Sequence, residues 1–389
     1  MVRQERSIQM SLLASPTTAT SAAKQAGTRT AAEFFAGIGL VRMALESAGI
    51  EVTWANDIEP IKARLYATNF DDDDYLLGDV RAVVGDDLPD IDIATASFPC
   101  TDLSLAGWRR GLDGEQSGMF WEFARVLEEM EHRRPPVVLL ENVPGFATSH
   151  GGKDLLAAVT RLNDLGYTCD LIQLDASRFV PQSRARLFII GSKVRLHDRP
   201  SETEWMRPQR LIDFALNHPT LDLQAAHVEP PIPVDLRLSE VVERLRPTNQ
   251  AWWEQERLAA FQQSLSPVQA DRLAEMIGGK RLSWRTAYRR TRAGVATWEI
   301  RADEIAGCLR TARGGSSKQA VVEAGNGQVR VRWMTAREYA RLQGAPDTFE
   351  FGTMSANQVM FGFGDGVCVP VVSWIANNIL NPLLDECNR

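Results

Sequence analysis

Residues 30–49, TAAEFFAGIGLVRMALESAG, decide the fold that the sequence predicts. The segment begins as a short apolar run, turns through Gly37 and Gly39, and continues with apolar residues at helical spacing up to the closing Gly49. A strand that passes through a glycine turn directly into an amphipathic helix is the first half of a βαβ unit. Glycines in such a turn also let a ligand approach the backbone near the N-terminus of the helix.

The alternation of strand-like and helical segments continues to about Lys193. Strand-like stretches end at Asp57, Ser97 and Asn142, and each precedes a segment with helical spacing of its apolar residues: 58–70, 117–130 and 152–166. Strands that alternate with helices of about 10–15 residues favour a parallel sheet covered on both faces. We therefore predict an α/β fold with a Rossmann-like sheet.

The sequence changes character near Arg195. The segments 195–209 and 225–235 are polar and rich in proline, and the strand–helix alternation does not return until about Arg330. Two helices are predicted after that, over 334–351 and 366–384, and the second is apolar enough to pack back on the first domain. The expected division is a flexible N-terminal arm (1–30), an α/β domain (31–199), a second, smaller irregular domain (200–325) and a C-terminal segment that returns to the α/β domain (326–389).

The composition is that of a soluble globular protein, with 44% hydrophobic and 24% charged residues. No apolar stretch approaches the ~20 residues of a membrane span, and residues 1–30 lack the apolar core of a secretory signal. The five cysteines and five histidines are scattered and include no CxxC pair. This argues against a disulfide framework and a zinc site. We expect a reduced, cytoplasmic protein that needs no metal and no membrane.

The charge is segregated along the chain, although the formal net charge is only −7. Acidic residues crowd the region from Asp57 to Asp92, whereas the region from Lys280 to Lys318 has ten Lys or Arg residues and three acidic ones. A local basic stretch is what contact with a phosphate backbone requires, whatever the net charge. The alternative is a solvated basic face.

Three candidate ligand contacts follow successive strands. The turn at Gly37 and Gly39 lacks the third glycine of the dinucleotide pattern, because Arg42 stands there. Asp57 is placed to accept hydrogen bonds from ribose hydroxyls, and Asp79 is placed to reach an adenine edge. Either acid could instead cap the helix that follows it. A nucleoside cofactor without a pyrophosphate clamp favours S-adenosylmethionine over NAD.

A thiol and a carboxylic acid follow two further strands. Cys100 comes directly after Pro99, beyond the strand 90–97, and Glu141 lies at the end of the strand 135–142. The carboxyl edge of an open α/β sheet is where ligands bind. Cys100 is alternatively an inert buried cysteine, and Glu141 a solvated acid before a turn. A free thiol has a pKa of about 8.5, so a nucleophilic cysteine needs cationic or dipolar help.

Three polar donors alternate in VPQSRARLFIIG, residues 180–191. In an extended strand Gln182, Arg184 and Arg186 share one face. That face could hold an anion, a carboxylate and a base carbonyl, or it could simply be the exposed face of a strand. With the thiol and the acid, these donors favour methylation of carbon 5 of a pyrimidine. Thiolate addition at C6 makes C5 nucleophilic, and an acid that protonates N3 drives that addition.

The chain closely resembles the DNA (cytosine-5)-methyltransferase family of the bacterial restriction–modification type, from about Ala31 to Pro382. Eight blocks occur in the family's order: FAGIGL (35–40), Asp57, GDV (78–80), FPC (98–100), ENV (141–143), QSRAR (182–186), REYARLQGAPD (337–347) and GDGVCVPV (364–371). The resemblance implies S-adenosylmethionine-dependent methylation of a cytosine flipped out of a specific duplex DNA sequence. It makes 31–199 the catalytic domain and 200–325 the target-recognition domain.

The resemblance also implies a role for individual residues. Cys100 is the nucleophile, Glu141 assists at N3, Arg186 contacts the base carbonyl, and Arg184 lies near the nucleophile loop and a phosphate. Residues 309–319 contact the DNA backbone. The implied cofactor-binding residues are Phe35, Gly37, Ile38, Gly39, Asp57, Ile58, Asp79, Val80, Pro99, Asp365 and Val367.

Three positions depart from the family pattern. Thr101 stands where Gln is usual, Asp365 where Asn is usual, and Ala345 where a bulky aromatic is usual. Two other functions stay open: methylation of a tRNA cytosine, and DNA binding by an inactive homologue. The expected partner is duplex DNA, bound by a monomer. The sequence does not reveal the recognition site, nor whether a separately encoded restriction endonuclease accompanies the enzyme.

Overall fold

A seven-stranded sheet forms the larger part of the protein. The structure, a computed structural model, describes residues 28–98, 118–232, 235–292, 294–311 and 318–387. The strand order is β3-β2-β1-β4-β5-β7-β6. The strands are β1 (Arg29–Phe34), β2 (Ile50–Asp57), β3 (Tyr75–Leu77), β4 (Ile93–Ala96), β5 (Val137–Asn142), β6 (Thr168–Asp175) and β7 (Ala185–Ser192).

The sheet is mixed, so the prediction of parallel pairing throughout was wrong at one edge. Strands β1 to β5 pair in parallel, but β7 pairs antiparallel with both β5 and β6. The reason lies in the connection between β6 and β7, which holds only a 3₁₀ turn (Ala176–Arg178) where a crossover helix would be needed. A short connection can only return the chain antiparallel.

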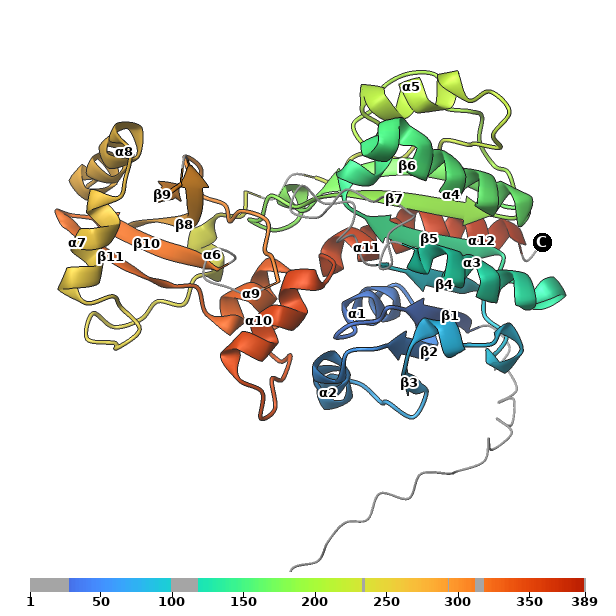
Figure 1. Cartoon of the computed structure of the whole chain (residues 1–389), viewed down its shortest axis with the longest axis horizontal. Helices are drawn as coiled ribbons and strands as arrows, with labels where there is room; N and C mark the ends of the chain where they lie inside the picture. The colour runs from blue at the N-terminus through green and yellow to red at the C-terminus, as the bar shows by residue number, and fades with distance from the viewer. Residues whose placement is uncertain (1–27, 99–117, 233–234, 293, 312–317, 388–389) are drawn as a thin grey trace, which may run out of the picture.

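Helices cover both faces of this sheet (Figure 1). Neighbouring residues of a strand face opposite sides, so Ala31 and Ala32 of β1 belong to different cores. One core includes residues of α1 (Leu40–Ser47), α11 (Val369–Ile375) and α12 (Asn381–Cys387). The other includes residues of α3 (Met119–Glu129), α4 (Lys153–Asp164) and α5 (Gln209–Asn217). Helix α2 (Pro60–Asn69) flanks β2 and β3.

A second sheet has four antiparallel strands in the order β11-β10-β8-β9. They are β8 (Ser283–Arg292), β9 (Val295–Ile300), β10 (Gln319–Gly325) and β11 (Gln328–Trp333). Helices α7 (Gln255–Gln263) and α8 (Pro267–Gly278) pack on one face through a separate apolar core. In Figure 1 this sheet lies on the side toward which β1 and β5 point.

Two helices, α9 (Ala336–Leu342) and α10 (Ala356–Asp365), lie between the two sheets (Figure 1). The predicted helix over 334–351 was too long, because Gly344 has a φ of +80° that an L-residue rarely adopts. The glycine-rich α10 was not predicted. The helical region Ala356–Cys387 is long and apolar enough to cross a membrane. However, 67% of its most apolar stretch is buried inside the protein.

A buried ion pair connects the four-stranded sheet to helix α9. Arg332 of β11 donates to Glu338 of α9 with an Nη1–Oε2 distance of 2.8 Å, and both side chains are fully buried. Helix α6 (Leu238–Val241) packs in the core on one face of the seven-stranded sheet. Leu211 and Phe214 of α5 pack in the core on the other face. We therefore propose that the second domain spans about 250–333 rather than 200–325.

Candidate active site

The turn after β1 has the shape that its glycines predict. Gly37 and Gly39 have φ values of +60° and +81°, and Phe35 also has a positive φ of 58°. A Cβ on Gly39 would lie 2.4 Å from a ring carbon of Phe70, the residue after α2, so this position has no room for a side chain. Ile38 is buried beneath it. The turn therefore presents backbone, not side chains, at the N-terminus of α1.

Asp57 ties this turn to the end of β2. Its Oδ2 accepts a hydrogen bond from the Gly37 amide at 2.8 Å, and its Oδ1 accepts one from the Glu59 amide at 2.8 Å. The next residue, Ile58, exposes 64% of its surface. A carboxylate beside an exposed apolar side chain suits a nucleoside, which carries both hydroxyl groups and a flat ring. These residues fit the expected cofactor.

Asp79 is occupied in a different way. Its carboxylate caps the 3₁₀ turn Val80–Ala82 by accepting from the Arg81 amide at 3.0 Å, so the capping alternative holds for this acid. The Arg81 side chain also pairs with it, at 2.5 Å between Nη2 and Oδ2. These hydrogen bonds to Arg81 lower the pKa of Asp79. A ligand that uses Asp79 has to share it with Arg81.

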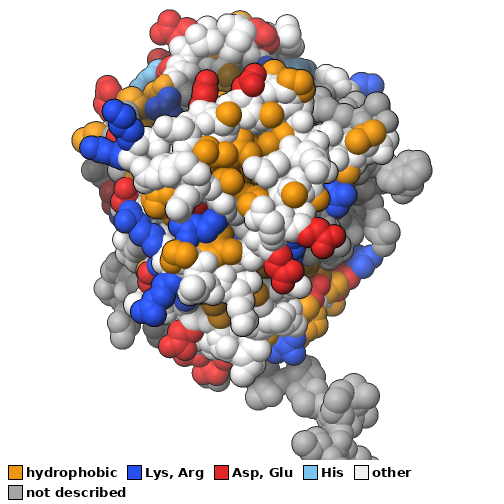
Figure 2. Space-filling model, turned by 90° about the vertical axis from the view of Figure 1, so that its left-hand side faces the viewer, with side chains coloured by type: hydrophobic (Ala, Val, Ile, Leu, Met, Phe, Trp, Pro, Cys, Tyr) orange, Lys and Arg blue, Asp and Glu red, His pale blue; other side chains and the backbone are white. Residues whose placement is uncertain are grey.

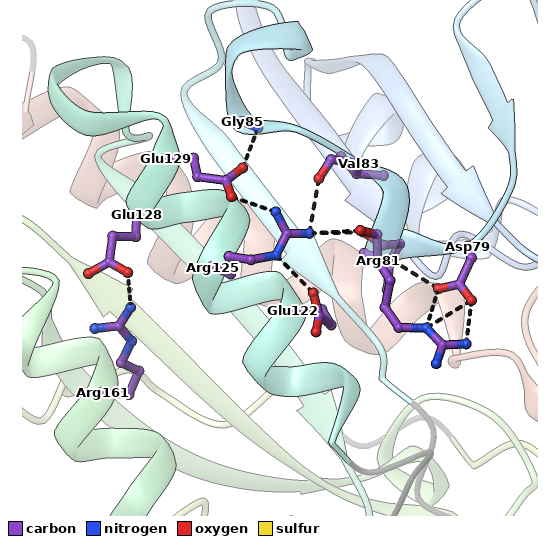
Figure 3. Close-up of polar contacts among 10 residues, drawn as sticks. Asp79, Arg81, Val83, Gly85, Glu122, Arg125, Glu128, Glu129 and Arg161 are labelled. Carbon is purple, nitrogen blue, oxygen red and sulfur yellow. Dashed lines mark hydrogen bonds and ion pairs between the residues drawn. The ribbon is translucent and has the colours of Figure 1, made fainter.

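Arg125 of α3 holds the segment that carries Asp79 (Figure 3). Its Nη2 donates to the Val83 carbonyl at 3.0 Å and lies within 3.4 Å of the Val80 and Arg81 carbonyls. Glu122 and Glu129 fix the other edges of the guanidinium at 2.8 and 2.6 Å. Glu129 in turn accepts from the Gly85 amide. The residues after Asp79 are thus bound to one face of α3.

The C-terminal segment returns to the same region. Asp365, the last residue of α10, pairs with Lys62 of α2 at 3.1 Å and accepts from the Thr311 hydroxyl. Val367 is buried close by. The carboxylate at position 365, where the resemblance led us to expect an amide, therefore has a cation beside it.

Glu33 is a buried acid of β1 that the sequence analysis missed. It is 1% exposed, and neither carboxyl oxygen has a hydrogen-bond partner within the described residues. Burial raises its pKa to about 8, and the charge of Arg42 only partly opposes this. Its only mark in the sequence is a single charged residue within the apolar run 31–35.

The predicted acid and arginine come together at the end of β5. Arg186 of β7 pairs with Glu141 at 2.7 Å between Nε and Oε1, and the two side chains are only 15% and 12% exposed. Antiparallel pairing of β5 with β7 places Glu141 opposite Phe188, two residues from Arg186. Pro99 and Cys100 lie outside the described residues, but the strand that leads to them, β4, is the neighbour of β5.

Gln182 and Arg184 lie before β7 and are buried, so they do not form an exposed face of this strand. The strand begins only at Ala185, and both side chains point into the protein with 0% and 3% exposure. Arg184 donates to the carbonyls of Leu309 and Gly366, and Gln182 to that of Leu342. Both side chains join β7 to segments from the far end of the chain.

Cys308 lies against this arginine pair. Its Sγ is 3.3 Å from Nη1 of Arg184. Burial would raise the pKa of the thiol, but the charges of Arg184 and Arg186 outweigh burial and lower it. No metal-binding group of three or more His, Cys, Asp or Glu side chains occurs within the described ranges.

The fold is that of known methyltransferases. A crystal structure of S. pombe Dnmt2 methyltransferase covers 91% of this chain and 99% of its own, with a TM-score of 0.59 and 18% identity. The methyltransferase EhMeth of Entamoeba histolytica gives a TM-score of 0.59 with 13% identity, over 92% of this chain and 99% of its own. At these identities the similarity shows the fold alone.

The sequence matches are more specific. The family model for C-5 cytosine-specific DNA methylase matches residues 30–381. The chain is 26% identical to the type II methyltransferase M.Bsp6I of Bacillus sp. (strain RFL6), over 91% of this chain and 99% of the relative. It is 28% identical to M.HhaI of Haemophilus parahaemolyticus, over 89% and 93%. The chain belongs to the C-5 cytosine-specific DNA methylase family, and it is a DNA (cytosine-5)-methyltransferase.

Proposed function

We propose that this enzyme methylates carbon 5 of a cytosine that is flipped out of duplex DNA, with S-adenosylmethionine as the methyl donor. The observation that carries the proposal is the pair formed by Glu141 and Arg186 at the end of β5. It lies on the sheet edge that also carries the glycine turn and Asp57. One edge thus offers an acid, a base-binding cation and a nucleoside site.

The cofactor would bind at the turn after β1 and at the ends of β2 and β3. The residues proposed to hold it are Phe35, Gly37, Ile38, Gly39, Asp57, Ile58, Asp79, Val80, Pro99, Asp365 and Val367. Bound S-adenosylmethionine would supply an electrophilic methyl group.

The chain's own residues would activate the cytosine. The Cys100 thiolate attacks C6, while Glu141 gives a proton to N3 and so takes up the charge that the attack pushes into the ring. Arg186 holds Glu141 and donates to the O2 carbonyl, which fixes the ring. Once C5 carries the methyl group, a base removes the C5 proton and the C5–C6 double bond re-forms. The Cys100 sulfur leaves as thiolate, and N3 returns its proton to the Glu141 carboxylate.

Arg184 would position neighbouring segments of the chain rather than contact the cytosine. Its guanidinium is fixed on the carbonyls of Leu309 and Gly366, so it holds the segment after β9 and the end of α10 against the strand of Arg186. Flipping costs a few kcal/mol of stacking and pairing, and contacts from the second domain would offset that cost.

Substrate and setting complete the proposal. The basic strand β8 and residues 309–319 would contact the DNA backbone. The enzyme would act as a cytoplasmic monomer, either alone or beside a separately encoded restriction endonuclease. A methyl-labelling assay with duplex DNA and tRNA in parallel tests this. Label in DNA alone is the expected result. Label in tRNA alone would identify tRNA as the substrate. No label in either, with cofactor binding retained, would identify an inactive DNA-binding homologue.

A further inference from the structure

An open hollow of about 280 Å³ lies on the second sheet, between α7 and the β8–β9 hairpin. Its lining includes Trp253, Trp298, Trp333 and Phe261, with Arg257 and Arg289 beside them. Figure 2 shows this end of the molecule, where hydrophobic side chains gather in the middle of the face and Lys and Arg side chains lie along one flank. The volume is close to the lower limit of small-molecule sites, roughly 300 Å³.

Three indoles form the aromatic wall of the hollow. The ring centroids of Trp253 and Trp333 are 5.3 Å apart, those of Trp253 and Trp298 are 5.4 Å apart, and those of Trp298 and Trp333 are 5.6 Å apart. Each of the three indoles stays partly exposed, so they are not simply the interior of the small core. A planar ring system could stack on this wall.

Two unpaired cations accompany the indoles. The Arg257 guanidinium lies 4.2 Å from the Trp253 ring and 5.1 Å from the Trp333 ring. Within the described part of the chain neither Arg257 nor Arg289 has a carboxylate within 4.0 Å, whereas the adjacent Arg290 pairs with Glu299 at 3.2 Å. Two free guanidinium groups repel a cationic ligand, such as a methylated amine, and attract an anion.

We propose that this hollow binds one unstacked nucleotide of the DNA substrate, other than the target cytosine. The base stacks on the indoles, and its phosphate pairs with Arg257 and Arg289. The aromatic wall suits the base and the two guanidinium groups suit the phosphate, and no carboxylate of the described residues has to be displaced. The inference rests on the proposed function only in naming DNA as the source of the nucleotide.

The test uses the full-length protein and a short single-stranded oligothymidylate as the probe. Binding is followed by quenching of tryptophan fluorescence and by probe anisotropy. The variant Arg257→Gln/Arg289→Gln removes both charges from exposed positions. Arg281→Gln removes an exposed charge elsewhere in the same domain and serves as the matched control. We expect the double variant to bind the probe about tenfold more weakly, with a shallower salt dependence, and the control to bind like wild type.

A second variant separates stacking from charge. Trp298→Leu should abolish most of the quenching while anisotropy still reports weakened binding, provided that its melting temperature stays near wild type. Equal probe affinity in the double variant and wild type would overturn the proposal. So would concentration-dependent dimerisation that the double variant loses without any change in probe binding, because a second copy would then occupy the hollow.

The same preparations are assayed for methyl transfer to duplex DNA. Lost probe binding with normal cofactor binding and residual transfer supports the hollow as a nucleotide site. Absent transfer in wild type refutes the proposed function instead, whatever the probe does.

Discussion

Arg186 and Glu141 form an ion pair with 2.7 Å between Nε and Oε1. They lie on β7 and β5, two neighbouring strands that are separated in the sequence. Both side chains are mostly buried, and the pair lies where β5 ends. The guanidinium therefore fixes the direction in which the Glu141 carboxyl group faces the site. A planar, forked donor is needed for this, because it can bind the acid and a second acceptor at once.

Arg186→Lys tests that geometry. A lysine keeps the charge but has one donor centre, so it cannot hold Glu141 and a base carbonyl together. We expect the turnover rate to fall about 100-fold with cofactor affinity unchanged. Arg195→Lys, which alters the exposed pair with Asp222 at the far edge of the sheet, is the control. Wild-type turnover in the Arg186 variant would remove this residue from the mechanism.

Arg125→Met tests how the segment after Asp79 is held. The variant leaves the carbonyls of Val80, Arg81 and Val83 without their shared donor, at a cost of about 1–3 kcal/mol of stability. We expect S-adenosylmethionine to bind roughly tenfold more weakly, because Asp79 and Val80 lose their anchor. Calorimetric titration of the variant with S-adenosylmethionine measures this affinity.

The matched control for this variant is Arg161, which pairs with Glu128 of the same helix α3 (Figure 3). Arg161→Met breaks an exposed pair with Glu128 that does not touch the segment after Asp79. Exposed pairs contribute about 0–1 kcal/mol, so cofactor affinity should stay at the wild-type value. If both variants weaken cofactor binding equally, general destabilisation is the cause.

Glu33 predicts a specific dependence of stability on pH. Its pKa is about 8 in the folded protein and 4.5 ordinarily, so between these values the folded state holds a proton that the unfolded state has released. Stability therefore falls as pH rises through this window, by about 1.4 kcal/mol per pH unit at most, and levels off above it. Urea unfolding of cofactor-free wild type and Glu33→Gln at several pH values isolates the contribution. Parallel curves for the two proteins would show that Glu33 is not the titrating group.

Cys308 should be the most reactive of the described cysteines at neutral pH. Arg184 and Arg186 lower its pKa, whereas burial raises the pKa of Cys169, Cys368 and Cys387. Limited alkylation of a Cys100→Ala protein, followed by peptide mass mapping, should modify Cys308 first. Preferential labelling of Cys387, a partly exposed thiol, would show that access rather than ionisation controls the reaction.

The positions of several candidate site residues were predictable because these residues follow strand ends. The glycine turn, Asp57 and Glu141 each come directly after or within an apolar strand, and the sheet then brings them to one edge. Tertiary contacts were not readable in the same way. Residues 309 and 366 supply the carbonyls that bind the buried Arg184 guanidinium, and no periodicity in the sequence reports these contacts.

Other differences have equally local causes. The direction of β7 depends on a short connection, which periodicity does not report. Glycines lower helix propensity, so α10 with its two interior glycines was missed, although it packs against α9. Glu33 was passed over because a single acid in an apolar strand carries no periodic signal.

The central claim is that Cys100 adds to the cytosine ring, and duplex DNA that contains 5-fluorocytosine tests it most directly. Fluorine at C5 blocks the final elimination, so the enzyme should remain covalently attached to the DNA when S-adenosylmethionine is present. We predict a stable adduct for wild type, a strongly reduced yield for Glu141→Gln, and no adduct for Cys100→Ala, which should still bind the cofactor. An adduct of equal yield with Cys100→Ala would contradict the account.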